Sequence, residues 1–413
     1  MAKMTVQSQI GWIYFSRDAL RKVEARLKAE QEGVLDEIGF LLLHQAYADR
    51  FFPGTSVLQT RLRYIFFVPW MYQGLMKSFR GGNFERELIQ KEVELTKRLL
   101  RHTKDGVIGS RSLPEATSQP ASMVYWTALG TWGFLRPLPD GHLPPRSRIH
   151  RFLSDRKNTV RLLDDDKEPL EEQWRIFVEL PAAPKDWDNP ERKLDFHLQK
   201  EEKNFLIKHL VALPSKSGNG ERSLLARLVE KRVLVSELGW PWEKPVLDAA
   251  SVNDRAALIR AMQAASLAAI GRGVYASLVE SALEQDGLET DSKHREALPE
   301  LIDKYGGDAL RLDIPAIWAD FPYLKRGIKS VLESTQEWIA KNRKDPSPLK
   351  DCYEKAEVTR KGMVRAKLPN TLHSRERRRE LNQEWSRKKN DSEPLHYRWR
   401  NVRRLLMDLW GEA

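Results

Sequence analysis

The stretch FFPGTSVLQTRLRYIFFVPWMY, residues 51–72, has the strongest local pattern in this chain. Ser56 followed three residues later by Gln59 has the spacing of a capping box, in which each side chain bonds the backbone amide of the other residue. A helix is therefore expected to begin near Val57. Pro69 lacks an amide hydrogen and disfavours helix in the residue before it, so the helix should kink or end there.

Apolar side chains cover most of this predicted helix, and Arg61 falls among them. A buried guanidinium is costly unless an anion pairs with it. Arg61 is therefore expected either to form an internal ion pair, with Asp49 or a later carboxylate, or to contact a phosphate. Arg63 points the other way and is expected to be solvated.

Composition bounds the class of protein. A chain of 413 residues predicts two or three domains, and 41% hydrophobic residues suffice for globular folding. The single cysteine, Cys352, excludes a disulfide framework and indicates a reducing compartment. The first residues lack the apolar core of a signal peptide, and no apolar run is long enough to span a bilayer. We expect a soluble, bacterial-type cytoplasmic protein.

The net charge of +11 is concentrated near the C-terminus. Residues 360–404 hold fifteen Lys and Arg against five Asp and Glu, an excess of ten in about a tenth of the chain. Such a segment is typical of a polyanion-binding surface.

Two amphipathic helices are predicted in this segment, at residues 374–389 and 395–410. Trp399, Val402, Leu405, Leu406 and Leu409 share one apolar face of the second helix. The basic residues either form a solvated face on helices that dock by their apolar sides, or contact phosphates without sequence preference. The candidate nucleic-acid contacts are Arg61, Arg375, Arg377, Arg378, Arg379, Arg387, Lys388, Lys389, Arg398, Arg400, Arg403 and Arg404.

Proline-rich stretches divide the chain into three predicted parts. A helical N-terminal domain covers 1–136, a mixed and then helical middle domain covers 149–345, and a basic helical segment covers 349–413. An amphipathic helix is predicted at Phe84–His102. Residues 105–136 then read as a polar turn, a helix and a short strand at 134–136, with a turn after it that would close a small hairpin. Helix, turn, helix and hairpin is the order of a winged helix, in which Ser122, Tyr125 and Thr127 would face a groove. The alternative for that helix is a buried core element. Residues 173–180 alternate weakly and are a second candidate strand.

No motif in the sequence identifies a chemical reaction. The glycine-rich stretch at 217–220 is followed by Glu221 and Arg222 instead of the Lys-Ser/Thr of a phosphate loop. Histidines and the lone cysteine lack metal-site spacing, so no cofactor, metal or catalytic residue is assigned. The enzymatic alternative is a metal-dependent nuclease with a degenerate carboxylate site near residues 164–179, for which Glu201 and Lys203 are the one nearby Glu-x-Lys match.

The opening stretch resembles an uncharacterised bacterial family, a numbered domain of unknown function. The family pattern is carried by Ile10-Gly11-Trp12, Phe15-Ser16, Phe52-Pro53-Gly54, Ser56, Gln59-Thr60-Arg61, Arg63-Tyr64, Phe67 and Pro69-Trp70, with Tyr397-Arg398-Trp399 near the C-terminus. The resemblance brings no assigned catalysis. It implies a context in bacterial anti-phage defence islands, beside helicases, nucleases or phospholipase-D-like proteins.

The sequence therefore predicts a mainly α, multidomain protein with a small α+β, winged-helix-like element. The leading functional hypothesis is a non-enzymatic DNA-binding and assembly subunit of an anti-phage defence complex, working with a helicase or nuclease and not with a membrane. The alternatives are the metal-dependent nuclease and a scaffold that binds only protein.

Overall fold

The structure, a computed structural model, describes residues 38–138, 141–155, 175–191, 193–216, 220–291, 293–324, 326–342, 344–385 and 392–412. These residues form fifteen α-helices and two 3₁₀ turns, and their only β-pairing consists of isolated bridges. The prediction of a mainly α protein is confirmed.

Eight of these helices lie before residue 250. They are α2 (Phe40–Phe51), α3 (Tyr64–Ser78), α4 (Phe84–Leu100), α5 (Ala121–Thr131), α6 (Arg146–Asp155), α7 (Lys200–Leu210), α8 (Leu224–Glu230) and α9 (Lys244–Ala249).

The other seven helices and both 3₁₀ turns lie after residue 250. The helices are α10 (Val252–Gln285), α11 (Lys293–Leu310), α12 (Ile314–Asp320), α13 (Lys329–Ala340), α14 (Lys350–Lys361), α15 (Leu372–Trp385) and α16 (Trp399–Trp410), and the turns are η1 (Arg326–Ile328) and η2 (Ser347–Leu349).

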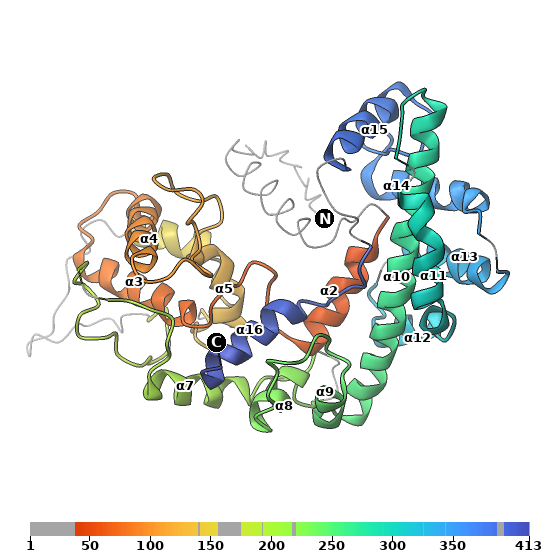
Figure 1. The fold of residues 1–413 in the computed structure, drawn as a ribbon. Helices are drawn as coiled ribbons and strands as arrows, with labels where there is room; N and C mark the ends of the chain where they lie inside the picture. Colours follow the sequence, from red (N-terminus) through yellow and green to blue (C-terminus); the bar gives the residue numbers. More distant parts are fainter. Residues whose placement is uncertain are drawn as a thin grey trace, which may run out of the picture.

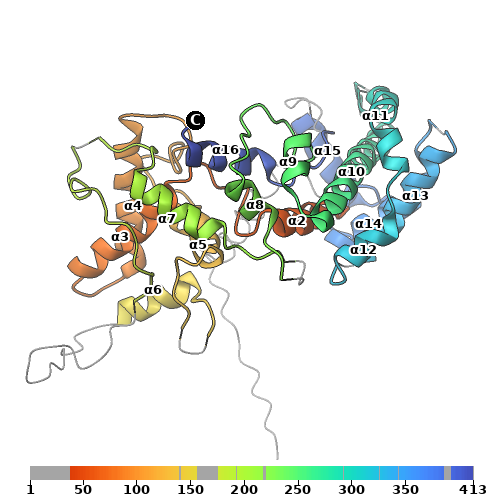
Figure 2. The same cartoon turned by 90° about the horizontal axis from the view of Figure 1, so that it is seen from below.

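The helices form two groups with a base between them (Figure 1). Helices α3 to α6 make one group, and α10 to α15 make the other. Helices α2, α8, α9 and α16 lie between the groups in both views, and α7 lies beneath the first group in Figure 1 and in front of it in the view from below in Figure 2. The last helix of the chain thus lies in the middle of the molecule.

Helix α10 organises the second group. Its 34 residues begin at Val252, the side chain of the preceding Ser251 accepts a hydrogen bond from the Asp254 amide, and α11 packs along the helix. Gly271 and Gly273 do not split it. At Gly271 the aromatic ring of Phe40 in α2 comes so close that a Cβ would lie 2.4 Å from its Cζ. This glycine therefore sets the close approach of α2 to α10.

Helix α3 differs from the prediction at both of its ends. It begins at Tyr64 instead of Val57, and it continues through Pro69 to Ser78. A proline removes one helical hydrogen bond, and here the surrounding buried aromatic residues of α3 hold the helix in place. Of the two expected outcomes at Pro69, a kink or an end, the end near Val68 is wrong, because burial outweighs that local cost.

The winged-helix element does not form. Residues 134–136 do not turn back into a hairpin; instead Leu135 forms an isolated antiparallel bridge with Phe177, inside the second candidate strand. Ser122 and Tyr125 are buried, so they cannot face a DNA groove. The alternative interpretation of α5 as a buried core helix agrees with the structure, since Tyr125 and the apolar residues beside it pack inward.

Apolar contacts cross both predicted domain boundaries. Leu62 and Trp132 from the first part, Leu210 and Leu225 from the second, and four apolar residues of α16 line one small cavity together. The buried apolar residues of all three parts belong to one connected core. Within the described residues, no helix combines the length and the apolar character needed to cross a bilayer.

Candidate functional site

The segment before α3 forms turns that receive the C-terminal helix. Only one of the two capping-box contacts forms: the Ser56 amide donates to Gln59 Oε1 (3.2 Å), whereas Ser56 Oγ accepts from the Leu58 amide (3.2 Å) and not from that of Gln59. These bonds close a turn instead of starting a helix. The Tyr125 hydroxyl lies 3.1 Å from the amides of Thr60 and Arg61 and accepts from them. These amides are thus satisfied from outside, and the helix starts later.

Side chains of helix α16 and of the residue before it form hydrogen bonds with further backbone groups of this segment. Asn401 donates to the carbonyl oxygens of Val57 (3.0 Å) and Gln59 (2.9 Å), and Arg398 donates to that of Thr55 (2.9 Å). The α16 helix therefore serves as the main-chain partner of residues 55–62, more than three hundred residues earlier in the sequence.

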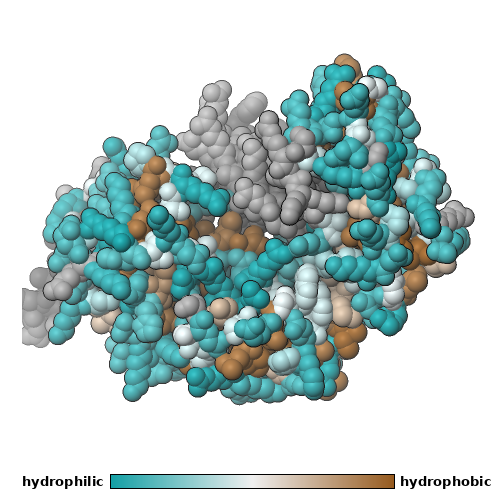
Figure 3. All heavy atoms as spheres, in the orientation of Figure 1, coloured by the Kyte–Doolittle hydropathy of each residue, from teal (hydrophilic) through white to brown (hydrophobic). Residues whose placement is uncertain are grey.

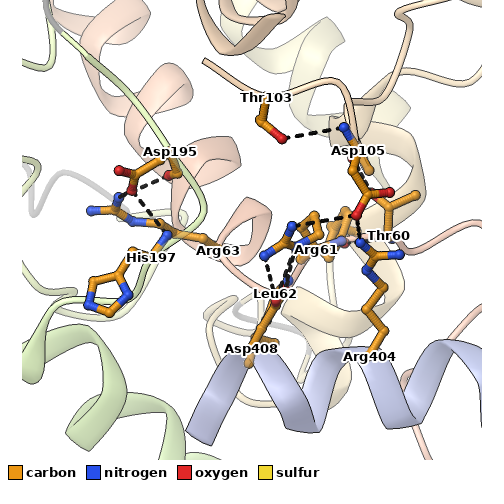
Figure 4. Close-up of polar contacts among 12 residues, drawn as sticks. Thr60, Arg61, Leu62, Arg63, Thr103, Asp105, Asp195, His197, Arg404 and Asp408 are labelled. Atoms are coloured by element: carbon orange, nitrogen blue, oxygen red, sulfur yellow. Dashed lines mark hydrogen bonds and ion pairs between the residues drawn. The ribbon is translucent and has the colours of Figure 1, made fainter. Parts of the chain in front are cut away.

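Arg61 pairs with Asp408 on α16 (Figure 4). Its Nε lies 3.0 Å from both carboxylate oxygens and its Nη2 lies 2.8 Å from Oδ1. The Leu62 amide donates to the same carboxylate at 2.7 Å. Of the two interpretations of Arg61, the internal ion pair is the one observed, and its partner is a later carboxylate instead of Asp49.

Asp105 and Arg404 extend this pair toward solvent. The Asp105 carboxylate lies 3.9 Å from Arg61 Nη1 and forms an ion pair with Arg404 of α16 (Figure 4). Asp408, Arg61, Asp105 and Arg404 thus make a chain of alternating charge that runs from the core to the surface. We call these four residues the arginine clamp.

Arg63 is buried, so the expectation that it is solvated is wrong. Its Nε and Nη2 bond the two carboxylate oxygens of Glu202 at 2.9 and 2.8 Å, and its Nη1 donates to the carbonyl oxygen of Asp195 at 3.0 Å. The helical wheel placed Arg63 on a polar side because it assumed a helix that does not exist at this position.

The arginines of α15 divide into buried and exposed members. Arg378 is buried and bonds Asp286 at 2.6 Å, and the half-exposed Arg375 pairs with the same carboxylate at 3.2 Å. Arg377 pairs with Glu380 at the surface. Arg379 is exposed. Arg387, Lys388 and Lys389 lie outside the described residues.

The arginines of α16 and of the residue before it follow a different arrangement. Arg398 is largely buried and pairs with Asp49 at 2.6 Å. Arg400 pairs with Glu393 at the surface, and Arg403 donates to the carbonyl oxygen of Leu238 at 2.9 Å. At 100° per residue, Arg400, Arg403, Arg404 and Met407 share the outer face of α16, while the predicted apolar face is buried. No carboxylate of α16 lies on that outer face.

The nuclease alternative cannot be placed on described residues. Residues 164–166 lie outside them. Of the Glu-x-Lys match, Glu201 is exposed on α7, and Lys203 rests on the ring of Trp410 with its Nζ 5.1 Å from the centroid. Across the described stretches, no three His, Cys, Asp or Glu side chains gather as metal ligands would.

A buried carboxylate that the sequence analysis missed lies in α4. Glu92 accepts a hydrogen bond from the Ser122 amide at 2.7 Å, so it caps the start of α5. Burial raises the pKa of Glu92 to about 7, while the Ser122 amide and the nearby charge of Arg146 act to lower it. Its second oxygen is buried without a hydrogen-bond partner among the described residues. No local pattern marks this glutamate, because the amide it caps is thirty residues away.

A carboxylate, an imidazole and a hydroxyl follow one another beside this group. Glu85 lies 3.9 Å from His150 Nδ1, and His150 Nε2 lies 2.6 Å from the Tyr72 hydroxyl. The order is that of an activated nucleophile. Tyr72 is fully buried, however, and burial raises the pKa of its hydroxyl, so the hydroxyl can neither ionise readily nor meet a substrate. The group is therefore a structural polar network.

The fold and the clamp define a mainly helical protein whose last helix is fixed to an N-terminal arginine segment by buried ion pairs. The chain belongs to DUF6361, a family of unknown function, whose family model matches residues 7–305. The match includes Arg61 and Asp105 and ends before α16, which supplies Asp408 and Arg404. Neither the curated proteins nor the solved structures include a match to this chain.

Proposed function

We propose that this protein is a non-enzymatic, DNA-binding and assembly subunit of a bacterial anti-phage defence complex, working with a helicase or nuclease partner. The observation that carries the DNA-binding part is the outer face of α16. Arg400, Arg403 and Arg404 share this face, and the buried face and Asp408 hold the helix in place.

A fixed helix with three arginines suits a phosphate backbone. Arginine donates several N–H groups in a planar fork that matches phosphate oxygens, and exposed ion pairs contribute little free energy. The pairs of Arg400 with Glu393 and of Arg404 with Asp105 are of this exposed kind. DNA phosphates can therefore replace these carboxylates as partners of the arginines at a low cost in free energy. Such contacts do not depend on the base sequence.

A second surface supports the assembly part of the proposal. Met363, Val364 and Leu372 lie in and beside the α14–α15 connection, with exposed fractions of 49%, 59% and 71%. The face shown in Figure 3 is mostly hydrophilic, with its hydrophobic residues in separate patches. Several exposed apolar side chains within ten residues of the sequence favour contact with a protein partner. The identity of that partner as a helicase or nuclease, and the defence context, come from the family resemblance alone.

A DNA titration at two salt concentrations tests this function. We expect the full chain to bind duplex or single-stranded oligonucleotides at low salt, with an affinity that falls steeply as salt rises. The triple variant Arg400→Gln, Arg403→Gln, Arg404→Gln should lose most of the binding and flatten the salt dependence. The matched control, Arg365→Gln, Arg377→Gln, Arg379→Gln, removes the same charge from the exposed α14–α15 region and should retain most of it.

Three results would reject parts of the proposal. Equal losses in the two triple variants would mean that binding follows net charge and not α16. If the wild-type chain does not bind DNA at low salt, the DNA-binding part is rejected and the alternative of a scaffold that binds only protein remains. Cleavage of the oligonucleotide that depends on Mg²⁺ and is lost in Asp166→Ala would favour the nuclease alternative. Circular dichroism of each variant checks that folding is retained.

A further inference from the structure

We infer that Arg61 and Arg404 form a binding site for one phosphate group, and that the Asp105 carboxylate closes this site in the structure. The inference rests on the proposed DNA-binding function and deepens it, because it names one phosphate-binding position and a residue that controls access to it. The arginine clamp carries the argument.

Arg61 uses only one edge of its guanidinium for Asp408. Its Nε and Nη2 bond that carboxylate, and its Nη1 faces Asp105 at 3.9 Å, which is longer than a hydrogen bond. The ring of Phe196 covers one face of the guanidinium, with Cζ 4.9 Å from the ring centroid. The Nη1 edge is therefore held in a fixed direction, toward an anion at the surface.

The loop that carries Asp105 is fixed against Arg61. Thr60 Oγ1 donates to the Gly106 carbonyl oxygen at 2.6 Å. At Gly106, where φ is +72°, a Cβ would lie 2.6 Å from Cγ of Arg61, so the backbone rests directly on the arginine stem. Asp105 itself remains exposed, with 66% of its side chain accessible. The carboxylate can thus leave the arginines by side-chain rotation while the loop stays in place.

Two guanidinium groups share this one exposed carboxylate. Burial lowers the pKa of Arg404, and the positive charge of Arg61 lowers it further, which indicates that the two cations repel each other. An anion between them relieves that repulsion. A phosphate group carries at least the charge of a carboxylate, and even a diester offers two charged acceptor oxygens, so it can bond Nη1 of Arg61 and the guanidinium of Arg404 together. Lys104, which is exposed next to Asp105, adds a third positive charge nearby.

The phosphate can come from two sources with the same chemistry, a diester of the DNA backbone or a free phosphate ion. Titrations of Asp105→Asn with inorganic phosphate and with a duplex oligonucleotide separate the two. Asp105→Asn removes the charge that closes the site and keeps the shape of the side chain. We expect its affinity to rise about three- to tenfold over wild type for at least one of these probes.

Glu393→Gln is the matched control. It removes another exposed carboxylate that pairs with an α16 arginine, Arg400, outside the clamp. Its affinity should change less than that of Asp105→Asn, and adding Arg404→Gln to Asp105→Asn should abolish the gain. A gain with both probes indicates a general phosphate site, and a gain only with the oligonucleotide indicates the DNA backbone.

The outcomes for this site and for the proposed function are distinct. Equal gains in Asp105→Asn and Glu393→Gln, or no gain with either probe, would overturn the inference even if the wild-type chain binds DNA. If the wild-type chain does not bind DNA but the Asp105→Asn variant binds inorganic phosphate, the phosphate site is supported and the proposed DNA-binding function is rejected. Thermal melting of each variant confirms that the exposed substitutions leave the fold intact.

Discussion

Asp408 is the residue on which the clamp depends. Its carboxylate neutralises the guanidinium of Arg61, whose side chain is largely buried, and also accepts a hydrogen bond from the Leu62 amide. Removing one partner of a buried pair leaves an uncompensated charge, which costs far more than losing an exposed pair.

We expect Asp408→Asn to lower the free energy of unfolding by about 3 kcal/mol, because the largely buried Arg61 guanidinium would lose its nearest counter-charge. The control Glu380→Gln breaks the exposed pair with Arg377 and should cost less than about 1 kcal/mol. Urea unfolding followed by circular dichroism measures both values. Similar small losses in the two variants would mean that the clamp contributes little to stability.

Glu92 predicts a pH dependence. Its pKa is about 7 in the folded protein against 4.5 for the free side chain, so the folded state binds this proton more tightly. The stabilisation is complete below about pH 4.5 and is lost as pH rises through about 7, a change of about 3 kcal/mol. Urea unfolding from pH 5 to 9 should show the decline in the wild type, and Glu92→Gln should flatten it. An unchanged decline in the variant would assign it to other groups.

At the scale of elements, α2 and α10 meet at a glycine. The absent Cβ of Gly271 leaves room for Phe40, whereas Gly307 in α11 has no atom within 4 Å of the same position. Both glycines lie within helices, so the intrinsic preference for alanine is the same for each. The difference between them isolates the packing of the two helices.

We expect Gly271→Ala to destabilise the protein by about 1–3 kcal/mol through overpacking against Phe40. Gly307→Ala should instead stabilise it by about 0.5–1 kcal/mol through helix propensity. Midpoints of thermal unfolding compare the two substitutions. If Gly271→Ala is also stabilising, the close contact between α2 and α10 does not constrain the fold.

Element boundaries also show where local patterns succeed. The prediction for α4 starts at the observed Phe84, and that for α16 ends at the observed Trp410; the apolar face of α16 is the buried one. The predicted start of α3 was wrong, and of the two capping-box contacts only the bond from the Ser56 amide to the Gln59 side chain forms. Partners from α5 and α16 satisfy backbone groups of residues 57–62 in place of a helix.

At the scale of the whole molecule, the last helix of the chain packs against segments from the N-terminal part of the sequence. Apolar residues of α16 line one cavity with Leu62, Trp132, Leu210 and Leu225, so removal of α16 would expose part of the common core. The boundaries proposed from proline-rich stretches remain a prediction, and the contacts cross both of them.

Deleting residues 399–413 should therefore abolish cooperative unfolding of the whole chain, or cause aggregation, because the core around Leu62 loses its cover. Deleting only residues 411–413 leaves α16 complete and should change the unfolding midpoint by a few degrees at most. Calorimetry of the two truncated proteins and the wild type measures this. A sharp, unshifted transition without α16 would mean that the helix is dispensable for the core.

The sequence by itself determined the mainly helical class, the positions of the two C-terminal helices, the family and the surplus of positive charge near the C-terminus. Each of these follows from spacing or composition along a short window. Tertiary structure alone decided which arginines are buried, because the partners of Arg61, Arg63 and Arg378 come from distant segments. A charge count cannot tell an arginine that faces solvent from one paired in the core, since that depends on where a carboxylate remote in sequence is brought by folding.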